Sequence, residues 1–263
     1  MGRTEFDEIK SNLKYSNPEE EDKDDRIWRI RKIVDIFNKN IKRFNFFLTT
    51  LSIDEMMAKY YDRWVLKQFI KGKPIRFGIK LWALCSYSGF LFHFEIYCGK
   101  NAKDNLLPNI ALGSRVVLQM LQHLLHHCTS RKLNEYHYYF DNLFCCPDLL
   151  LHLKINGLRA TGTVRSNRIK ATNDIRKQNG APGVTPMSNV SRYDKESRSK
   201  IAIPFPNTFC IYNKFMGGVD LHDQHANQVR PSIHSKKWTW IIMIRLVQAA
   251  ATNATATMNT TIM

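Results

Sequence analysis

Four aspartates are the residues of this sequence whose surroundings best suit metal chemistry. Asp54 follows the apolar segment LSI and Asp141 follows the aromatic segment YYF, so the sequence predicts each at the end of a buried strand. Asp220 and Asp223 are three residues apart and therefore share one face of a predicted helix. An unpaired carboxylate is costly to bury, so residues in such settings normally have a cation or several hydrogen bonds.

Carboxylates from distant parts of the chain converge if that helix packs across the sheet. Oxygen-only, anionic ligand sets suit Mg²⁺ or Mn²⁺, which keep several waters and bind few carboxylates together with substrate phosphate. Such a site supports phosphodiester cleavage and strand transfer with two ions about 3.5–4 Å apart. The alternative is that each aspartate is an ordinary strand-end or cap residue, satisfied by backbone amides.

The segments around these acids predict an α/β fold. Apolar residues recur at helical spacing in some segments, and β-branched and aromatic residues are concentrated in others. Helices are predicted over residues 26–47, 113–128 and 147–155, and strands over residues 51–54, 75–86, 90–98, 136–140 and 158–164.

This order, β-β-β-α-β-α-β, is that of an RNase H-like core with flanking helices, followed by an insertion and a closing helix. We expect a five-stranded mixed sheet in which the first three strands are antiparallel and the last two add in parallel. The predicted parts are an acidic disordered tail (1–25), an amphipathic helix leading into the core (26–48), the first part of the core (49–165), a shortened basic insertion without regular structure (166–212) and the closing helices (213–263), the last of them predicted over residues 236–253.

Net charge and cysteine usage narrow the class of protein. The formal net charge is +16, and the first 25 residues carry nine acids and four bases, so the remainder is near +21. Such an excess favours a polyanionic partner, because neutralising phosphates releases counterions. The six cysteines show no C-x-x-C spacing and no paired histidines, so we expect reduced thiols and no zinc site. No segment predicts a signal peptide or a membrane span.

Seven sequence blocks resemble those of piggyBac-type DDE/DDD transposases, in the same order, between Arg26 and Asn253. They are LSIDEMM (51–57), KGKPIRFGIKLWALC (71–85), FEIYCGK (94–100), YYFDNLF (138–144), GLRATGTVRSNR (157–168), YNKFMGGVDLHDQ (212–224) and SKKWTW (235–240).

The resemblance implies a catalytic triad of Asp54, Asp141 and Asp220, with Asp223 as a further metal ligand. It also implies two Mg²⁺ or Mn²⁺ ions, DNA as partner (transposon ends or a TTAA-containing target), a nuclear location and no membrane, with a homodimer left open. The expected DNA contacts are Arg63, Lys71, Lys73, Arg76, Lys80, Arg165, Arg168, Lys236, Lys237 and Trp238. The alternative is a solvated surface role for each basic residue and core packing in an aromatic helix for Trp238.

The sequence also departs from the family pattern. Asp62 stands where the family usually has glycine, Cys145 and Cys146 replace a small hydroxylated pair, and Val229 replaces an aromatic residue. The W-x-D strand block of the insertion is missing, and the chain looks like a truncated core without the N-terminal DNA-binding part and the Cys-rich C-terminal domain.

Three functional hypotheses remain open from the sequence. The first is a metal-dependent DNA nuclease and strand-transfer core, which the intact acids favour. The second is a domesticated or degenerate relic that binds DNA or chromatin without catalysis, which the missing modules favour. The third is a basic structural protein in which the blocks occur by accident.

Overall fold

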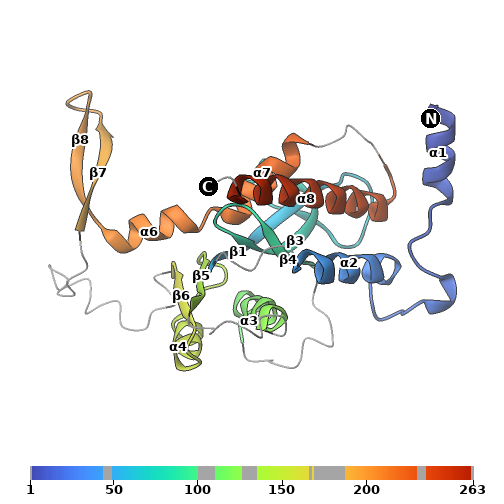
Figure 1. Cartoon of the computed structure of the whole chain (residues 1–263), viewed down its shortest axis with the longest axis horizontal. Coiled ribbons are helices and arrows are strands. Elements are labelled where there is room, and N and C mark those ends of the chain that lie inside the picture. Colours follow the sequence, from blue (N-terminus) through green and yellow to red (C-terminus); the bar gives the residue numbers. More distant parts are fainter. Residues whose placement is uncertain are drawn as a thin grey trace.

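A six-stranded mixed sheet with helices on both faces forms the centre of the protein (Figure 1). The computed structural model describes residues 2–43, 49–99, 110–125, 135–165, 168, 187–229 and 235–261. The strands of the sheet are β1 (Thr50–Lys59), β2 (Lys67–Phe69), β3 (Phe77–Ser86), β4 (Leu91–Ile96), β5 (His137–Phe140) and β6 (Arg159–Gly162). The longer helices are α1 (Arg3–Asn12), α2 (Trp28–Ile41), α3 (Leu112–Leu125), α4 (Pro147–Ile155), α6 (Asn207–Phe215), α7 (Gly218–Gln228) and α8 (Trp238–Thr261).

The strand order is the one that the sequence predicts. β1, β3 and β4 form an antiparallel meander, and β5 and β6 join β1 in parallel. The order along the sheet is β2-β3-β1-β5-β6, and β4 pairs with β3 at residues 81–85, beyond the part of β3 that pairs with β2. The RNase H-like arrangement is therefore confirmed, with the three-residue strand β2 as an addition that the sequence did not predict.

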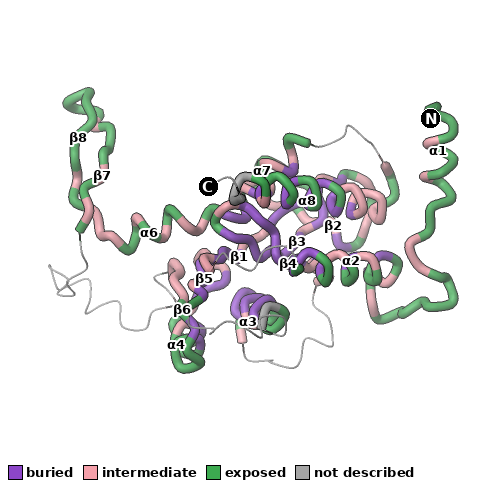
Figure 2. Tube along the Cα trace, in the orientation of Figure 1, coloured by how far each residue is buried: buried purple, intermediate pink, exposed green. Residues whose placement is uncertain are grey.

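Alternation along the strands divides the hydrophobic core between the two faces of the sheet. Leu51 and Ile53 pack in a core with residues of α3 and α4. Met56 and Ala58 pack in a second core with residues of α2, α7 and α8. The buried positions accordingly concentrate in the sheet and on the helix faces that cover it (Figure 2). A side chain's position along β1 therefore decides which group of helices it meets.

The prediction that the first strand ends at Asp54 is wrong. β1 continues to Lys59, because its antiparallel pairing with β3 runs on to the pair Lys59–Gly78. The parallel pairing with β5 stops at the pair Ile53–Phe140. Asp54 thus lies within β1, at the point where one of its two neighbouring strands ends.

The prediction of an irregular segment over residues 166–212 is also wrong where the structure describes it. β7 (Met187–Asp194) and β8 (Ser199–Pro206) form an antiparallel hairpin, and α6 follows at Asn207. In β8 the residues Ile201, Ile203 and Phe205 occupy every second position, and β-branched and aromatic residues favour strands. Most of residues 166–186 lie outside the described part of the chain.

The acidic tail that was predicted to be disordered contains the ten-residue helix α1. Contacts with α8 and the residues before it account for this. The ring of Phe6 packs edge-on against Trp240 with 6.0 Å between centroids. Lys237 Nζ donates to the carbonyl of Ser11 at 3.0 Å. Neither contact can be read from the tail's own composition.

Helix bounds differ from the prediction mainly at the ends. α2 covers residues 28–41 of the predicted 26–47, and residues 44–47 lie outside the described chain, as do residues 126–128 of the second predicted helix (113–128). α8 runs to Thr261 rather than to residue 253. Within the described residues, no helix is long and apolar enough to cross a membrane.

Two asparagines bind the backbone of β4. The side chain of Asn38 in α2 donates to the carbonyl of Phe94 at 2.9 Å and accepts from its N–H at 3.1 Å. The side chain of Asn253 in α8 makes the same pair of bonds to Leu91, at 2.9 and 2.8 Å. Both helices are thereby fixed to one strand.

Candidate active site

Asp54 and Asp141 each follow a residue of the last pair between the neighbouring parallel strands β1 and β5. The last residues paired between β1 and β5 are Ile53 and Phe140, and each aspartate is the next residue along its strand direction. Neighbouring strands are about 4.8 Å apart. Because Ile53 points into the core under α3 and α4, Asp54 points to the opposite face, where α7 packs.

Both carboxylates are held by backbone amides. The N–H of Glu55 donates to Asp54 Oδ1 at 2.7 Å, and the N–H of Leu143 donates to Asp141 Oδ1 at 2.7 Å. These bonds are those expected of ordinary strand-end aspartates. They fix the two side chains but leave other carboxylate lone pairs for further ligands.

The electrostatic setting of Asp54 is unusual. Burial, together with the charges of Asp220 and Asp141, raises the pKa of Asp54 to about 7, against the opposing effects of the Lys73 charge and the Glu55 amide. Asp54 therefore interacts with both other members of the predicted triad. A buried carboxyl with two acids beside it gains from a bound cation, which would restore its charged form.

A close backbone approach places Asp220 near this pair. A Cβ on Gly218 would lie 2.1 Å from the carbonyl oxygen of Ser86 and 2.7 Å from Ser52 Oγ, so only glycine allows α7 to approach the sheet this closely. His222 Nδ1 donates to the carbonyl of Gly89 at 2.9 Å, which fixes the next turn of α7. Asp220 itself, in the first turn, keeps 69% of its side chain exposed.

Lys73 supplies the positive charge among these acids. Its Nζ lies 3.5 Å from Asp220 Oδ1 and 3.5 Å from the carbonyl oxygen of Glu55. Burial lowers the pKa of Lys73, but the charges of Asp54 and Asp220 outweigh it and raise the pKa. The ammonium group thus partly neutralises the site, although the sequence predicted this residue as a phosphate contact.

Asp223 is engaged by a buried arginine. Arg245 of α8, whose side chain is 4% exposed, donates through Nη2 to Asp223 Oδ1 and lies 3.2 Å from Met56 Sδ. This ion pair links α7 to α8. The role of Asp223 as a further metal ligand stays a prediction.

The aspartates share one neighbourhood but not the spacing of a closed metal site. Within the described residues, the only three potential ligands whose donor atoms all lie within 4.8 Å of one another are His93, Glu95 and His123. The donor set of Asp54, Asp141 and Asp220 is oxygen-only and anionic and so fits Mg²⁺ or Mn²⁺. Binding such ions requires the carboxylates to move closer, which the exposure of Asp220 allows.

The predicted DNA contacts separate into two groups. Five of them are exposed and carry charge without a carboxylate partner among the described residues: Arg63, Lys71, Arg76, Lys236 and Lys237, the last of which also donates to the carbonyl of Ser11. The exposed Arg165 donates to Asn142 Oδ1 at 3.0 Å and remains at the surface.

The other group is occupied by contacts within the protein. Lys80 Nζ lies 3.0 Å from Glu55 Oε2 and 4.0 Å from the ring centroid of Trp82. Arg168 Nη1 donates to the carbonyls of Asn142 and Cys145 at 2.7 and 2.9 Å. The half-buried Trp238 stacks on Trp64 with 4.4 Å between centroids. Lys80 and Arg168 therefore have structural roles that the sequence did not reveal, whereas aromatic packing was the alternative already open for Trp238.

Tyr212 is a residue near the site that the sequence analysis did not assign. Burial raises the pKa of its phenol, a hydrogen bond with Thr163 opposes this, and the charges of Asp141 and Asp54 raise it again. Tyr212 is the first residue of the block YNKFMGGVDLHDQ, one of those that resemble the family, so the sequence could have pointed to it. No signal pointed to Arg245, because its contact with Asp223 depends on how two helices pack.

Known proteins similar to this chain were found by sequence and by structure. A family model described as "Transposase IS4" matches residues 1–191 and 183–255. The human PiggyBac transposable element-derived protein 3 is 32% identical over 271 residues, which cover 90% of this chain and 45% of that protein. The human PiggyBac transposable element-derived protein 2 is 25% identical over 288 residues, 96% of this chain and 48% of that protein. This chain therefore spans about half the length of these curated relatives.

A solved structure has the same fold. It is described as a cryo-EM structure of a piggyBac transposase synaptic complex with hairpin DNA, and it matches with a TM-score of 0.78 at 21% identity, covering 97% of this chain and 57% of that chain. The match agrees with the RNase H-like arrangement of strands described above. The family model and the relatives together show that this chain belongs to the piggyBac-type family of transposases and transposase-derived proteins.

Proposed function

We propose that this domain cleaves DNA and joins DNA strands with the help of divalent metal ions held by Asp54, Asp141 and Asp220. The observation that supports this most directly is the meeting of three acids from β1, the end of β5 and the first turn of α7. Asp54, whose pKa burial raises, interacts electrostatically with both others. Acids without a shared function have no reason to be gathered in this way, because their mutual repulsion destabilises the fold.

The ions in this proposal are Mg²⁺ or Mn²⁺, and they would activate a water or a 3′-hydroxyl and stabilise the leaving oxygen. The chain's own residues prepare the site. Backbone amides orient Asp54 and Asp141, and Gly218 lets α7 bring Asp220 against the sheet. Lys73 neutralises the acids before ions bind, and its flexible ammonium group can then turn to a phosphate oxygen.

DNA is the proposed substrate, because the structural relative was solved with hairpin DNA and this chain carries a large positive charge. The exposed Arg63, Lys71, Arg76, Lys236 and Lys237 would contact phosphates. Transposon ends or TTAA-containing targets, a homodimer and a nuclear location complete the proposal. Binding that depends on phosphates should weaken steeply with salt, and salt-insensitive binding would contradict this part.

The second candidate is a transposase-derived domain that binds DNA or chromatin without cleaving it. Two observations favour it. The three acids lie farther apart than a closed ion site requires, and the carboxylate of Asp223 is already bound to Arg245. The two candidates share the DNA-binding surface and differ only in whether the acids bind ions.

Nicking of supercoiled plasmid in Mn²⁺ separates the two candidates. We expect the purified chain to nick, and Asp141→Asn to reduce the rate at least about 100-fold, because the metal's charge stabilisation is worth several kcal/mol. Asp148→Asn, which changes an exposed acid in α4, is the matched control and should nick like the wild type. DNA binding without nicking would favour the second candidate, and equal nicking by all three proteins would point to a contaminating nuclease.

A further inference from the structure

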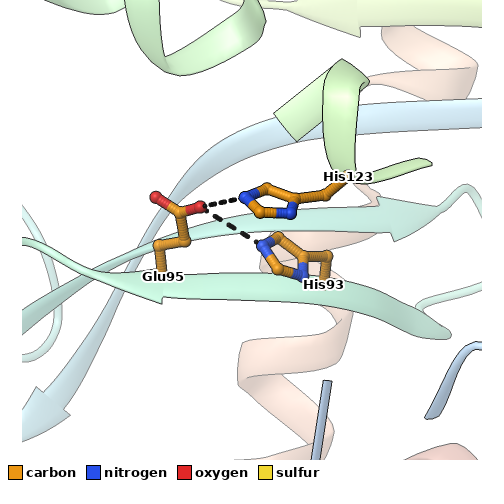
Figure 3. Close-up of side chains that lie close together, drawn as sticks. All are labelled: His93, Glu95 and His123. Atoms are coloured by element: carbon orange, nitrogen blue, oxygen red, sulfur yellow. Dashed lines mark hydrogen bonds and ion pairs between the residues drawn. The ribbon is translucent and has the colours of Figure 1, made fainter. Parts of the chain in front are cut away.

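Two histidines and one glutamate from different elements meet on one side of the sheet. His93 and Glu95 belong to β4, and His123 lies in the last turn of α3. His93 Nε2 lies 3.4 Å and His123 Nε2 lies 2.9 Å from the same oxygen, Glu95 Oε1 (Figure 3). The two imidazole rings are stacked, with 4.4 Å between centroids and 27° between planes. Both ring nitrogens therefore point at one place.

These distances are close to those of a tetrahedral ion site. Zinc binds histidine nitrogen and carboxylate oxygen at about 2.0–2.1 Å, and tetrahedral angles then separate the ligand atoms by about 3.3 Å. The two nitrogen–oxygen distances, 2.9 and 3.4 Å, lie on either side of that value. An ion can replace the two hydrogen bonds after shifts of a few tenths of an ångström.

The chemical state of the three side chains also suits a metal. Burial lowers the pKa of His93, which favours the neutral ring that a metal ion requires. Burial raises the pKa of Glu95, but the hydrogen bonds from His123 and His93 lower it more, so that the pKa is about 2. His93 is 5% exposed, whereas Glu95 and His123 keep 31% and 48% of their side chains exposed. A fourth ligand, such as water, can therefore reach an ion from one side.

Asp35 of α2 and Lys42, which follows that helix, lie near the cluster and influence its affinity for a cation. Lys42 Nζ donates to the carbonyl of His123 at 3.1 Å and opposes a cation. Asp35 interacts electrostatically with His123 and Glu95 and favours one. Nδ1 of His93 has no hydrogen-bond partner among the described residues. Such outer partners are worth 10–100-fold in affinity, so we expect weaker binding than at a finished structural zinc site.

The cluster is separate from the three aspartates. Glu95 pairs across the strands with Trp82, which packs in the core under α3 and α4. Asp54 pairs with Ala83, which packs in the core under α2, α7 and α8. Neighbouring positions on β3 face opposite sides of the sheet. Imidazole ligands prefer late transition metals, whereas carboxylates alone suit Mg²⁺ and Mn²⁺, so the two sites also differ in the ion they select.

We propose that His93, Glu95 and His123 form a binding site for one transition-metal ion of the zinc class, with a fourth position open to solvent. Because two ligands come from β4 and one from α3, the bound ion ties that helix to the sheet. The sequence predicted no zinc site, since it offers no C-x-x-C or paired-histidine motif. The alternation of His93 and Glu95 on one strand face was a local signal, but His123 comes from thirty positions away.

Titration of the full chain, produced without a histidine tag and stripped with EDTA, tests the site. Co²⁺ serves as the probe, because its visible absorption reports four-coordinate binding, and Zn²⁺ competes for the same site. We expect one Co²⁺ per chain. The variants His123→Ala and Glu95→Gln should bind at least about 100-fold more weakly, beyond the effect of losing an outer partner.

The control is His152→Ala, which removes an exposed histidine of α4 and should leave Co²⁺ binding unchanged. Circular dichroism shows whether each variant is folded, and Glu95→Gln keeps the size of the side chain if His123→Ala fails to fold. Unchanged binding by folded His123→Ala and Glu95→Gln, no binding by the wild type, or equal loss in the control would overturn the proposal. Mn²⁺-dependent nicking of DNA is independent of this outcome, so the two proposals fail separately.

Discussion

Replacing Asp54 by asparagine is expected to stabilise the metal-free protein while removing the proposed activity. Burial raises the pKa of Asp54 from its ordinary value of 3.8 to about 7. Between these values the folded protein holds a proton that the unfolded chain has released. The unfolded state then binds fewer protons than the folded state, so the free energy of unfolding falls as pH rises through this window. Asparagine does not ionise and escapes this loss.

The size of the effect follows from the width of the window. Each pKa unit corresponds to about 1.36 kcal/mol, and the interval from pH 5 to pH 7 covers two units. Between pH 5 and pH 8, the variant should therefore gain about 3 kcal/mol of stability relative to the wild type. The measurement is urea unfolding in EDTA at both pH values, where the difference between the two midpoints should grow by roughly 1 M.

A midpoint difference that is the same at pH 5 and pH 8 would refute the reasoning, because it would show that Asp54 does not titrate in this window. Adding Mn²⁺ at pH 8 provides an internal check. Ions that bind the folded wild type stabilise it by mass action, so the advantage of the Asp54→Asn variant should shrink.

Two further substitutions test how the site is built. Gly218→Ala would bring a methyl group within 2.1 Å of the Ser86 carbonyl, so α7 must shift by about 1 Å. We expect this shift to lower the nicking rate about 100-fold. The control Gly217→Ala should nick normally, because a methyl group there would have no atom within 4 Å. Loss of stability alone, with normal nicking by folded Gly218→Ala, would contradict this view. Asp223→Ala leaves Arg245 buried without its carboxylate partner, so we expect the free energy of unfolding, measured by thermal unfolding, to fall by about 3–5 kcal/mol. A fall of less than about 0.5 kcal/mol would mean that the ion pair contributes little to stability.

The sequence predicts the sheet well because the signals for it are local. Alternating and aromatic segments mark the strands, and the glycine of the Ser88-Gly89 turn adopts a positive φ of 86° as such a turn requires. The acids that follow the runs LSI and YYF are neighbours in space because those runs pair in parallel, which the predicted order of elements already implies. The length of β1 was missed, since it depends on how far β3 continues beside it.

The parts of the site that escaped prediction depend on contacts between distant segments. Lys73 lies among the acids because the segment after β2 folds back over β1, and nothing in its neighbouring sequence distinguishes it from the exposed Lys71. In the sequence, Arg245 only interrupts an apolar helix; its ion pair with Asp223 depends on the packing of α7 against α8. The hairpin of β7 and β8 shows the same limit, because a basic segment with turn residues can still pair with itself.

The asparagine contacts along β4 have a consequence for how this molecule meets other chains. An asparagine amide has the same donor and acceptor groups as a peptide unit, so at Phe94 and Leu91 it takes the place that a neighbouring strand would occupy. An incoming strand would have to displace both side chains before it could extend the sheet there. Natural sheets avoid uncontrolled aggregation by blocking such borders. Self-association by strand pairing along this border is therefore disfavoured.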